Sequence, residues 1–322
     1  MAFRSVAYAE YCNVDRGTKW SELRRSHGYE QPHNVRYWCL GNEMDGPWQI
    51  GQLQSREYGR KARDVAQLRG LDRNVQLIAC GSSGTNMPQY LVWDREVLEE
   101  CFDQVDGISL HAYYGNTPAL TRNSTARYLA MNLDMDRQIH EVAAVCDYVQ
   151  ALRRSSKRLW LSFDEWNVWY RARSGDAVDG RRGFAPRLLE EVYNLEDALL
   201  VGGFVNTLLR NSDRVRVACL AQLVNVIAPL VTNETSVLRQ STYIPYAWAL
   251  RYARGRVLEW GDVTPAKVLA CETLTGPDLK AFNTFAQPRN VAPQRLEPPP
   301  AAPRMTFKLP PRSYTVVQFA TM

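Results

Sequence analysis

Two glutamates stand in similar surroundings and could act together on one substrate. Glu43 lies in residues 37–48 and Glu165 lies in residues 161–170; each follows a short apolar run and has aromatic residues on both sides. Such a pair suits cleavage of a glycosidic bond, in which one carboxylic acid protonates the departing oxygen and a second carboxylate attacks or stabilises the anomeric carbon. Retaining enzymes hold the two groups roughly 5 to 5.5 Å apart, so the fold must bring these distant stretches together.

The residues beside each glutamate limit what it can reach. Side chains alternate between the two faces of a strand, so we expect Asp164 to point away from Glu165 and to be paired or hydrogen bonded behind the sheet. By the same rule, His111 and Tyr113 should share one face of another strand. Tyr113 is then placed to hydrogen-bond a carboxylate across a barrel. His111 could do the same or could be a satisfied core residue, and the sequence leaves both interpretations open.

Strands and helices alternate from residue 35 to about residue 225. Nearly continuous apolar runs, typical of strands covered on both faces, occur at residues 35–42, 75–81, 107–114, 158–165 and 215–223. Helical patterns occur at residues 55–69, 93–102, 135–154 and 188–210. This alternation predicts parallel strands joined by crossover helices.

Polar residues decide between two folds for these strands, an open doubly wound sheet or part of an eight-stranded barrel. Functional side chains follow the carboxyl ends of several strands, namely Asn42, Glu43, Ser82, Ser83, His111, Tyr113, Glu165, Gln222 and Asn225. Barrel enzymes collect their sites at that end, and the chain has no G-x-G-x-x-G or Walker pattern of a nucleotide crevice. We therefore predict an α/β fold of the (β/α)8 TIM-barrel type over residues 1–255.

After residue 255 the alternation of strands and helices gives way to short β-like segments. Short β-like segments occur at residues 268–272, 279–285, 305–309 and 314–320, and a Pro-rich stretch at residues 288–303 interrupts them. These strands are few for a free-standing sandwich. We assign residues 256–322 to a reduced C-terminal β-sandwich module.

Composition argues against several classes of protein. The net charge of +5 comes from 39 basic and 34 acidic residues that form no basic face, so a nucleic-acid binder is the weakest option. The seven cysteines are scattered without a C-x-x-C pair, which indicates free thiols in a reducing compartment. The chain has neither a run of about 18 apolar residues nor an evident export signal, so we expect a cytosolic protein without a membrane partner.

Four stretches resemble the α-L-arabinofuranosidases of glycoside hydrolase family 51. They are YWCLGNEMDGPWQIG at residues 37–51, ISLHAYYGN at 108–116, LSFDEWNVWY at 161–170 and AQLVNVIAP at 221–229, in the order in which the family has them. The resemblance implies a retaining enzyme of the (β/α)8 clan. Glu43 would end the fourth strand as the general acid/base, and Glu165 would end the seventh strand as the nucleophile.

The same resemblance assigns further residues. Asn42 would hydrogen-bond the 2-hydroxyl of the sugar, and Tyr113 would orient the nucleophile. The sugar pocket would be lined by Trp48, Trp169, His111 and Gln222. The substrate would be an arabinofuranosyl oligosaccharide, and neither a metal nor an organic cofactor is implied. The acid/base must switch roles, so we expect the pKa of Glu43 to be raised in the free protein.

The chain departs from the family pattern at both ends. If residues 35–42 form the fourth strand, only 34 residues precede it, so we expect strands one to three to be missing and the barrel to consist of strands four to eight. The sandwich is expected to be shortened as well. Open sheet edges invite pairing with another chain, so we expect a homo-oligomer if a full-length form exists.

Three functions stay open. The first is an active intracellular α-L-arabinofuranosidase that takes part in L-arabinose metabolism. The second is a catalytically incompetent fragment of such an enzyme, and the third is a retaining endoglucanase or xylanase on the same scaffold. The run GNEMDGPWQIG favours the arabinofuranosidase over the third.

Overall fold

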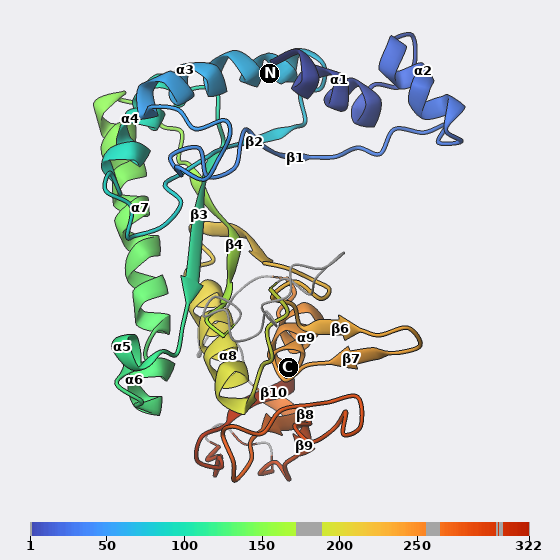
Figure 1. Ribbon diagram of the computed structural model, residues 1–322, viewed down its shortest axis with the longest axis vertical. Coiled ribbons are helices and arrows are strands. Elements are labelled where there is room, and N and C mark those ends of the chain that lie inside the picture. The colour runs from blue at the N-terminus through green and yellow to red at the C-terminus, as the bar shows by residue number, and fades with distance from the viewer. Residues whose placement is uncertain (1, 172–188, 256–264, 301, 303–304, 322) are drawn as a thin grey trace, which may run out of the picture. The chain divides into compact units, whose positions relative to one another are not determined.

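The structure, a computed structural model, describes residues 2–171, 189–255, 265–300, 302 and 305–321 (Figure 1). The chain divides into two compact units. The first unit comprises Met1–Ala112, Arg137–Glu165 and Asp213–Cys219. The second unit comprises Tyr113–Asp136, Trp166–Ser212 and Leu220–Met322.

The first unit is built on a five-stranded sheet whose strands follow one another in chain order, β1-β2-β3-β4-β5. They are β1 (Tyr37–Cys39), β2 (Gln76–Ala79), β3 (Gly107–Tyr114), β4 (Trp160–Val168) and β5 (Val215–Leu220), and most residues of each belong to this unit. β1 and β2 are parallel, with Tyr37 opposite Gln76, and β2 and β3 are parallel, with Ile78 opposite Gly107. A doubly wound sheet reverses its strand order at a switch point, whereas a barrel does not, so the order supports the expected partial (β/α)8 barrel.

Each of the five strands overlaps a stretch in which the sequence predicted one. β1 is the shortest, and within the described sheet only β2 offers it backbone hydrogen bonds. β4 is longer than predicted and continues to Val168. Its burial is nearly continuous except at Asp164 and Glu165, which are partly exposed.

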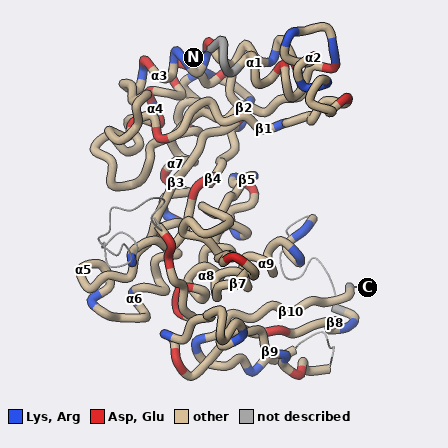
Figure 2. Tube along the Cα trace, turned by 45° about the vertical axis from the view of Figure 1, so that its right-hand side comes forward, with Lys and Arg blue, Asp and Glu red and all other residues tan. Residues whose placement is uncertain are grey.

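Helices precede and join the strands of the first unit. They are α1 (Ala2–Asn13), α2 (Lys19–Ser26), α3 (Ser55–Val65), the 3-10 helix η1 (Ala66–Gly70), α4 (Val92–Cys101) and most of α7 (Asn132–Leu152). The predicted helices at residues 55–69, 93–102 and 135–154 are thereby confirmed. A buried apolar cluster that includes Ala9, Val65, Leu68 and Leu77 packs α1, α3 and η1 together with β2. The colours of the trace in Figure 2 mark basic and acidic residues along α3 and α4. Between these helices, Nη2 of Arg56 lies 2.8 Å from Oε2 of Glu99.

The second unit combines several helices with two small antiparallel sheets. Its elements are α5 (Pro118–Thr121), α6 (Thr125–Leu129), α8 (Leu195–Arg210), β6 (Leu230–Thr232), β7 (Val237–Arg239), α9 (Tyr243–Tyr252), β8 (Pro265–Leu274), β9 (Gln294–Arg295) and β10 (Tyr314–Thr321). α8 begins at Leu195 because Asn194 and Asp197 form a capping box. The predicted helix at residues 188–210 is therefore shorter, and residue 188 lies outside the described part of the chain. Leu199, Trp248 and Leu274 belong to the core that joins α8, α9 and β8.

The C-terminal module forms a three-stranded antiparallel sheet in the order β10-β8-β9. The segments at residues 268–272 and 314–320 are confirmed as parts of β8 and β10. The segments predicted at 279–285 and 305–309 are not strands. In the first of them, the Asn283 side chain donates to the carbonyls of Arg239 and Val291, each at 3.0 Å, and these contacts hold a loop. The division between residues 1–255 and 256–322 stays a prediction, since residues 256–264 lie outside the described ones.

None of the described helices combines the length and the apolar character that a membrane-spanning helix needs.

Candidate active site

Glu43 and Glu165 both belong to the first unit, near the carboxyl ends of β1 and β4. Glu43 lies in a turn after β1 in which its own φ is +45° and the φ of Gly41 is +159°. A left-handed backbone is strained for a residue other than glycine, and such strain is found most often at functional sites. The side chains of Glu43 and Glu165 are 14% and 28% exposed, so a substrate could reach both.

His111 contacts both glutamates. Its Nδ1 lies 3.1 Å from Oε1 of Glu43 and 3.5 Å from Oε2 of Glu165, while its Nε2 lies 3.2 Å from Oδ1 of Asp164. The side chain of His111 is only 5% exposed. Of the two interpretations left open by the sequence, the one in which His111 binds a carboxylate is therefore confirmed.

The carboxylates set the charge of this imidazole. Burial alone would lower the pKa of His111, but Asp164 and Glu43, which contact the ring, and the charge of Glu165 raise that pKa to about 10. At neutral pH the ring is an imidazolium, and both of its nitrogens can donate.

The pKa of Glu43 differs from the sequence expectation. Burial would raise this pKa, but the hydrogen bonds from His111 and Trp48 outweigh burial and lower it. The expectation of a raised pKa in the free protein is therefore wrong. It failed because two N–H donors, one of them on a cation, stabilise the carboxylate form.

Asp164 does not lie behind the sheet, as the alternation rule led us to expect. Its carboxylate contacts Nε2 of His111 and accepts from Sγ of Cys39 at 3.2 Å. The rule fixes the direction of Cβ, whereas Glu165 carries its carboxylate one methylene further from the backbone. As a result, Asp164 and Glu165 reach the same imidazole although they are neighbours in β4.

Trp48 and Gln49 also bind the carboxylate of Glu43. The indole N–H of Trp48 donates to Oε2 of Glu43 at 2.5 Å, and a hydrogen bond from Gln49 contributes to the lowered pKa. Gly46 makes room for this indole, since a Cβ at Gly46 would lie 2.5 Å from Cε2 of Trp48. The indole is nevertheless 58% exposed, so its other face is accessible.

A second group of acidic side chains holds the loop around Glu43 and was not predicted from the sequence. Asp45 accepts from Oγ of Ser82 at 2.8 Å and from the backbone N–H and the hydroxyl of Ser83. Asp94 in turn accepts from the backbone N–H of Ser82 at 2.9 Å. The serines at the end of β2 thus link the Glu43 loop to α4. The sequence placed both serines at the carboxyl end of a strand but did not indicate Asp45 or Asp94 as their partners, because a short sequence pattern does not name a distant partner.

Asp94→Asn is expected to stabilise the protein at neutral and alkaline pH. Burial is the main cause that raises the pKa of Asp94 to about 6. The folded-state pKa lies above the unfolded value of about 3.9. Between these two pKa values the folded state therefore binds more protons than the unfolded state. As a result, the free energy of unfolding falls as the pH rises through about 4 to 6. We expect Asp94→Asn to gain about 1 to 3 kcal/mol at pH 8 and little near pH 4.

Urea unfolding of this variant at both pH values measures the effect. Asp103→Asn, which changes a carboxylate that is 58% exposed, serves as the control. A stability difference between Asp94→Asn and the parent that did not change with pH would contradict the expectation.

The other predicted site residues are distributed over the two units. Asn42 is exposed in the turn that precedes Glu43. Tyr113, Trp169 and Gln222 belong to the second unit, in which the rings of Tyr113 and Trp169 meet edge to face with centroids 5.1 Å apart. Their expected contacts with a sugar or with Glu165 stay predictions.

The site could also be considered as a metal centre. Glu43, His111 and Glu165 offer three ligand atoms that lie within 4.8 Å of one another. An imidazole binds a metal only through an unprotonated nitrogen, whereas the pKa of His111 is raised to about 10. A metal would have to displace a proton that the carboxylates stabilise. The arrangement therefore suits proton transfer better than metal binding, and the expectation of no metal stays a prediction.

Known proteins resemble the chain along most of its length. The family model of the α-L-arabinofuranosidase 1 domain matches residues 2–132, and that of the α-L-arabinofuranosidase C-terminal domain matches residues 164–261. An intracellular exo-α-(1→5)-L-arabinofuranosidase 1 of Bacillus subtilis is 50% identical over 252 residues, which make up 78% of this chain and 50% of that protein. An exo-α-(1→6)-L-arabinofuranosidase of Bifidobacterium longum is 45% identical over 76% of this chain and 48% of its own length. The chain spans about half the length of the curated relatives it matches.

Solved structures of α-L-arabinofuranosidases also resemble the chain. A family 51 α-L-arabinofuranosidase from Bifidobacterium longum superposes with a TM-score of 0.84 at 30% identity, over 99% of this chain and 74% of that one. An α-L-arabinofuranosidase from Thermotoga maritima has the same fold, with a TM-score of 0.82 at 23% identity over 100% of this chain and 73% of that one.

Proposed function

The chain belongs to glycoside hydrolase family 51, the α-L-arabinofuranosidases, and we propose that it hydrolyses terminal non-reducing α-L-arabinofuranosides in arabinose-containing oligo- and polysaccharides. One observation carries this proposal most directly. The nearest ligand atoms of Glu43 and Glu165 lie within 4.8 Å of each other, with an imidazole in contact with both. This spacing fits a retaining pair and is too short for the inverting pair, whose carboxyl groups stand about 6.5 to 9.5 Å apart.

In the proposed reaction, a carboxylate oxygen of Glu165 attacks the anomeric carbon while Glu43 gives a proton to the departing oxygen. Water then hydrolyses the glycosyl ester of Glu165, with Glu43 acting as the base. Because the pKa of Glu43 is lowered in the free protein, the bound sugar must raise it. A sugar does so by excluding the water that still reaches the carboxylate.

His111 positions both carboxylates in this scheme. Its protonated ring holds Glu43 through Nδ1, and Asp164 contacts Nε2 from the other side of the ring. The ring also lowers the repulsion between Glu43 and Glu165, which would otherwise disfavour two negative charges at this spacing. We further propose that Asn42 binds the 2-hydroxyl and that Tyr113 orients Glu165. Trp169 and Gln222 would contact the sugar.

The linkage that the enzyme cleaves and its location in the cell are proposals that the relatives support. An exo-acting enzyme on α-(1→5)-linked arabinose is proposed, because the printed names of several relatives describe this activity in an intracellular enzyme. A cytosolic location in L-arabinose metabolism agrees with the seven cysteines, all of which are free thiols. Assembly of a full-length form into a homo-oligomer is proposed as well, and the position of β1 at the edge of the described sheet supports it.

Release of 4-nitrophenol from 4-nitrophenyl α-L-arabinofuranoside tests the proposal. We expect turnover of this substrate and much weaker turnover of 4-nitrophenyl β-D-xyloside and β-D-cellobioside. Preferred cleavage of either β-glycoside would favour a xylanase or endoglucanase. Absence of turnover on all three would favour a catalytically incompetent fragment.

Trp48→Phe is expected to move the basic limb of the pH profile of kcat/KM to higher pH. Loss of the indole N–H removes one of the hydrogen bonds that lower the pKa of Glu43, and kcat/KM reports the acid of the free enzyme. Gly46→Ala should act in the same direction, because its methyl group would displace the indole. Trp20→Phe, in α2, provides a matched control. A basic limb that stayed in place in both site variants would contradict this role of Trp48.

A further inference from the structure

The ring of His111 lies between three carboxylates of the first unit, and its two nitrogens face different ones. Nδ1 lies 3.1 Å from Oε1 of Glu43 and 3.5 Å from Oε2 of Glu165, whereas Nε2 lies 3.2 Å from Oδ1 of Asp164. A neutral imidazole has a single N–H and can donate from one nitrogen only. Because each nitrogen faces a carboxylate oxygen, the arrangement is satisfied when both nitrogens carry a proton. The proton on Nδ1 then lies beside the two glutamates of the proposed reaction.

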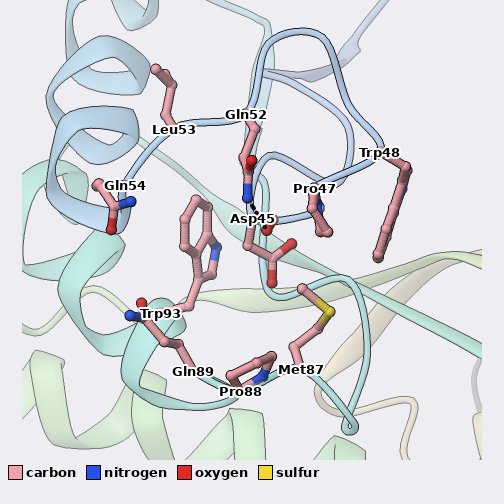
Figure 3. Close-up of a pocket in the computed structure, with 10 residues that line it drawn as sticks. All are labelled: Asp45, Pro47, Trp48, Gln52, Leu53, Gln54, Met87, Pro88, Gln89 and Trp93. Atoms are coloured by element: carbon pink, nitrogen blue, oxygen red, sulfur yellow. Dashed lines mark hydrogen bonds between the residues drawn. The ribbon is translucent and has the colours of Figure 1, made fainter.

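Glu43 carries no proton of its own at neutral pH, because its surroundings lower its pKa. Its Oε2 accepts from the indole of Trp48, which stands at one end of the pocket in Figure 3, and its Oε1 faces Nδ1 of His111. A general acid must nevertheless hold a proton when it meets the departing oxygen. Among the donors to this carboxylate, which are Trp48, Gln49 and His111, only the imidazolium is an acid that can release a proton.

Asp164 determines which nitrogen of His111 gives up its proton. In a neutral imidazole, the hydrogen bond that one nitrogen makes decides where the remaining proton lies. Asp164 faces Nε2, and its second oxygen accepts from Sγ of Cys39 at 3.2 Å, which fixes the carboxylate beside the ring. Within the described part of the chain, no cation other than His111 forms an ion pair with Asp164. The ring therefore keeps the proton on Nε2 and exchanges the proton on Nδ1, on the side of the glutamates.

We propose that His111 stores the proton that Glu43 gives to the departing oxygen, and that Asp164 is a positioning residue that holds the other proton of the ring on Nε2. The proposal rests on the proposed function, since it supplies a step of the same reaction. When a sugar binds, the proton leaves Nδ1 for Oε1 of Glu43, the ring becomes neutral, and Glu43 becomes the acid. The number of protons in the site does not change, so the sugar has only to shift one proton along one hydrogen bond.

The protons balance over the two steps of the reaction. In the first step, Glu43 gives its proton to the departing oxygen while Glu165 forms the glycosyl ester, so a carboxylate is left beside a neutral ring. In the second step, Glu43 takes a proton from the attacking water, the water oxygen bonds to the anomeric carbon, and the bond to Glu165 breaks. The charge of Glu165, which helps to hold a proton on His111, is thereby restored. The proton then returns from Glu43 to Nδ1, and the store is filled for the next turnover.

Asp164→Asn is expected to move the basic limb of the pH profile of kcat/KM for α-(1→5)-arabinotriose to lower pH by roughly one unit or more, because a carboxylate that contacts the ring is lost. At lower pH, where the ring stays protonated in the variant as well, the loss of activity should be small. Cleavage of 4-nitrophenyl α-L-arabinofuranoside, whose leaving group needs no proton, should show no such shift. Asp213→Asn, at an exposed carboxylate of the first unit, should keep the limb of the parent. A merely structural role of Asp164 would lower kcat/KM for both substrates equally at every pH.

Nitrogen-15 NMR of the histidine rings locates the proton directly and without turnover. The chain has four histidines, of which His27, His33 and His140 are exposed. Glutamine at each of these three positions in turn removes one set of ring signals, and the remaining set belongs to His111. In the parent without substrate, we expect both nitrogens of His111 to be protonated at pH 8, and in Asp164→Asn we expect Nδ1 to lose its proton at lower pH than in the parent.

The outcomes separate the proton store from the proposed function. A neutral His111 ring in the parent at pH 8 would overturn the store, even if Asp164→Asn did not fold. A basic limb that Asp164→Asn left in place would overturn the role of Asp164. In both cases, cleavage of arabinotriose by the parent would leave the proposed function intact. If the parent cleaved no arabinofuranoside, the proposed function would fail, and the store would fail with it whatever the state of the ring.

Discussion

Glu165→Ala is expected to abolish turnover of 4-nitrophenyl α-L-arabinofuranoside, with a loss in kcat on the order of 10⁴- to 10⁶-fold, as when the nucleophile of another enzyme is removed. The variant cannot form the glycosyl ester, and the methyl side chain leaves a gap beside the anomeric carbon. Glu165 also contributes to the raised pKa of His111, so this pKa should fall in the variant.

Azide distinguishes loss of the nucleophile from loss of the fold. In Glu165→Ala a small anion can enter the gap and attack the anomeric carbon directly, so we expect azide to restore turnover and to give the β-azide, with inverted configuration. Glu234→Gln, at an exposed carboxylate in the second unit, should retain the parent activity. Ordinary turnover by Glu165→Ala without azide would remove this residue from its proposed role.

The sheet and the two glutamates could be predicted because their signals are local. Apolar runs such as residues 107–114 must be strands covered on both faces, and the crossover helices between them fix a parallel order. Once five such strands run side by side, residues at their carboxyl ends come together regardless of the loops. Glu43 and Glu165 could therefore be paired from the sequence alone.

The contacts between these residues could not be predicted in the same way. The direction of Asp164 depends on which donor stands opposite, and His111 comes from a different strand. The same holds for Asp45, whose partners Ser82 and Ser83 follow β2. A sequence pattern gives residue types, whereas each of these bonds requires the relative positions of two loops.

The pKa of Glu43 could not be predicted because it depends on these contacts between loops. The role of an acid argues for a raised pKa, but the donors that face the carboxylate lower it in the free protein. The two statements are compatible only if the substrate changes the surroundings of Glu43. Trp48, which is exposed and bound to Glu43, is one residue of the first unit that a sugar would contact while doing so.

Glu43→Ala is expected to slow cleavage of arabino-oligosaccharides by about 10²- to 10⁴-fold, the usual contribution of general acid–base catalysis. A sugar alkoxide is a poor leaving group and needs the proton of Glu43, whereas 4-nitrophenolate departs without one. With the aryl substrate the first step should therefore survive, and the second step, which needs a base, should become limiting. We expect a burst of 4-nitrophenol that corresponds to one equivalent of enzyme, followed by slow turnover.

Azide again supplies the decisive comparison. It needs no general base, so in Glu43→Ala it should attack the accumulated glycosyl ester and give the α-azide, the opposite product to that expected from Glu165→Ala. The variant should also lose the basic limb of its pH profile, since that limb follows the ionisation of Glu43. An equal loss on aryl and sugar leaving groups, without a burst, would mean that Glu43 does not donate the proton. The acid would then have to be sought among the groups that contact it, beginning with His111.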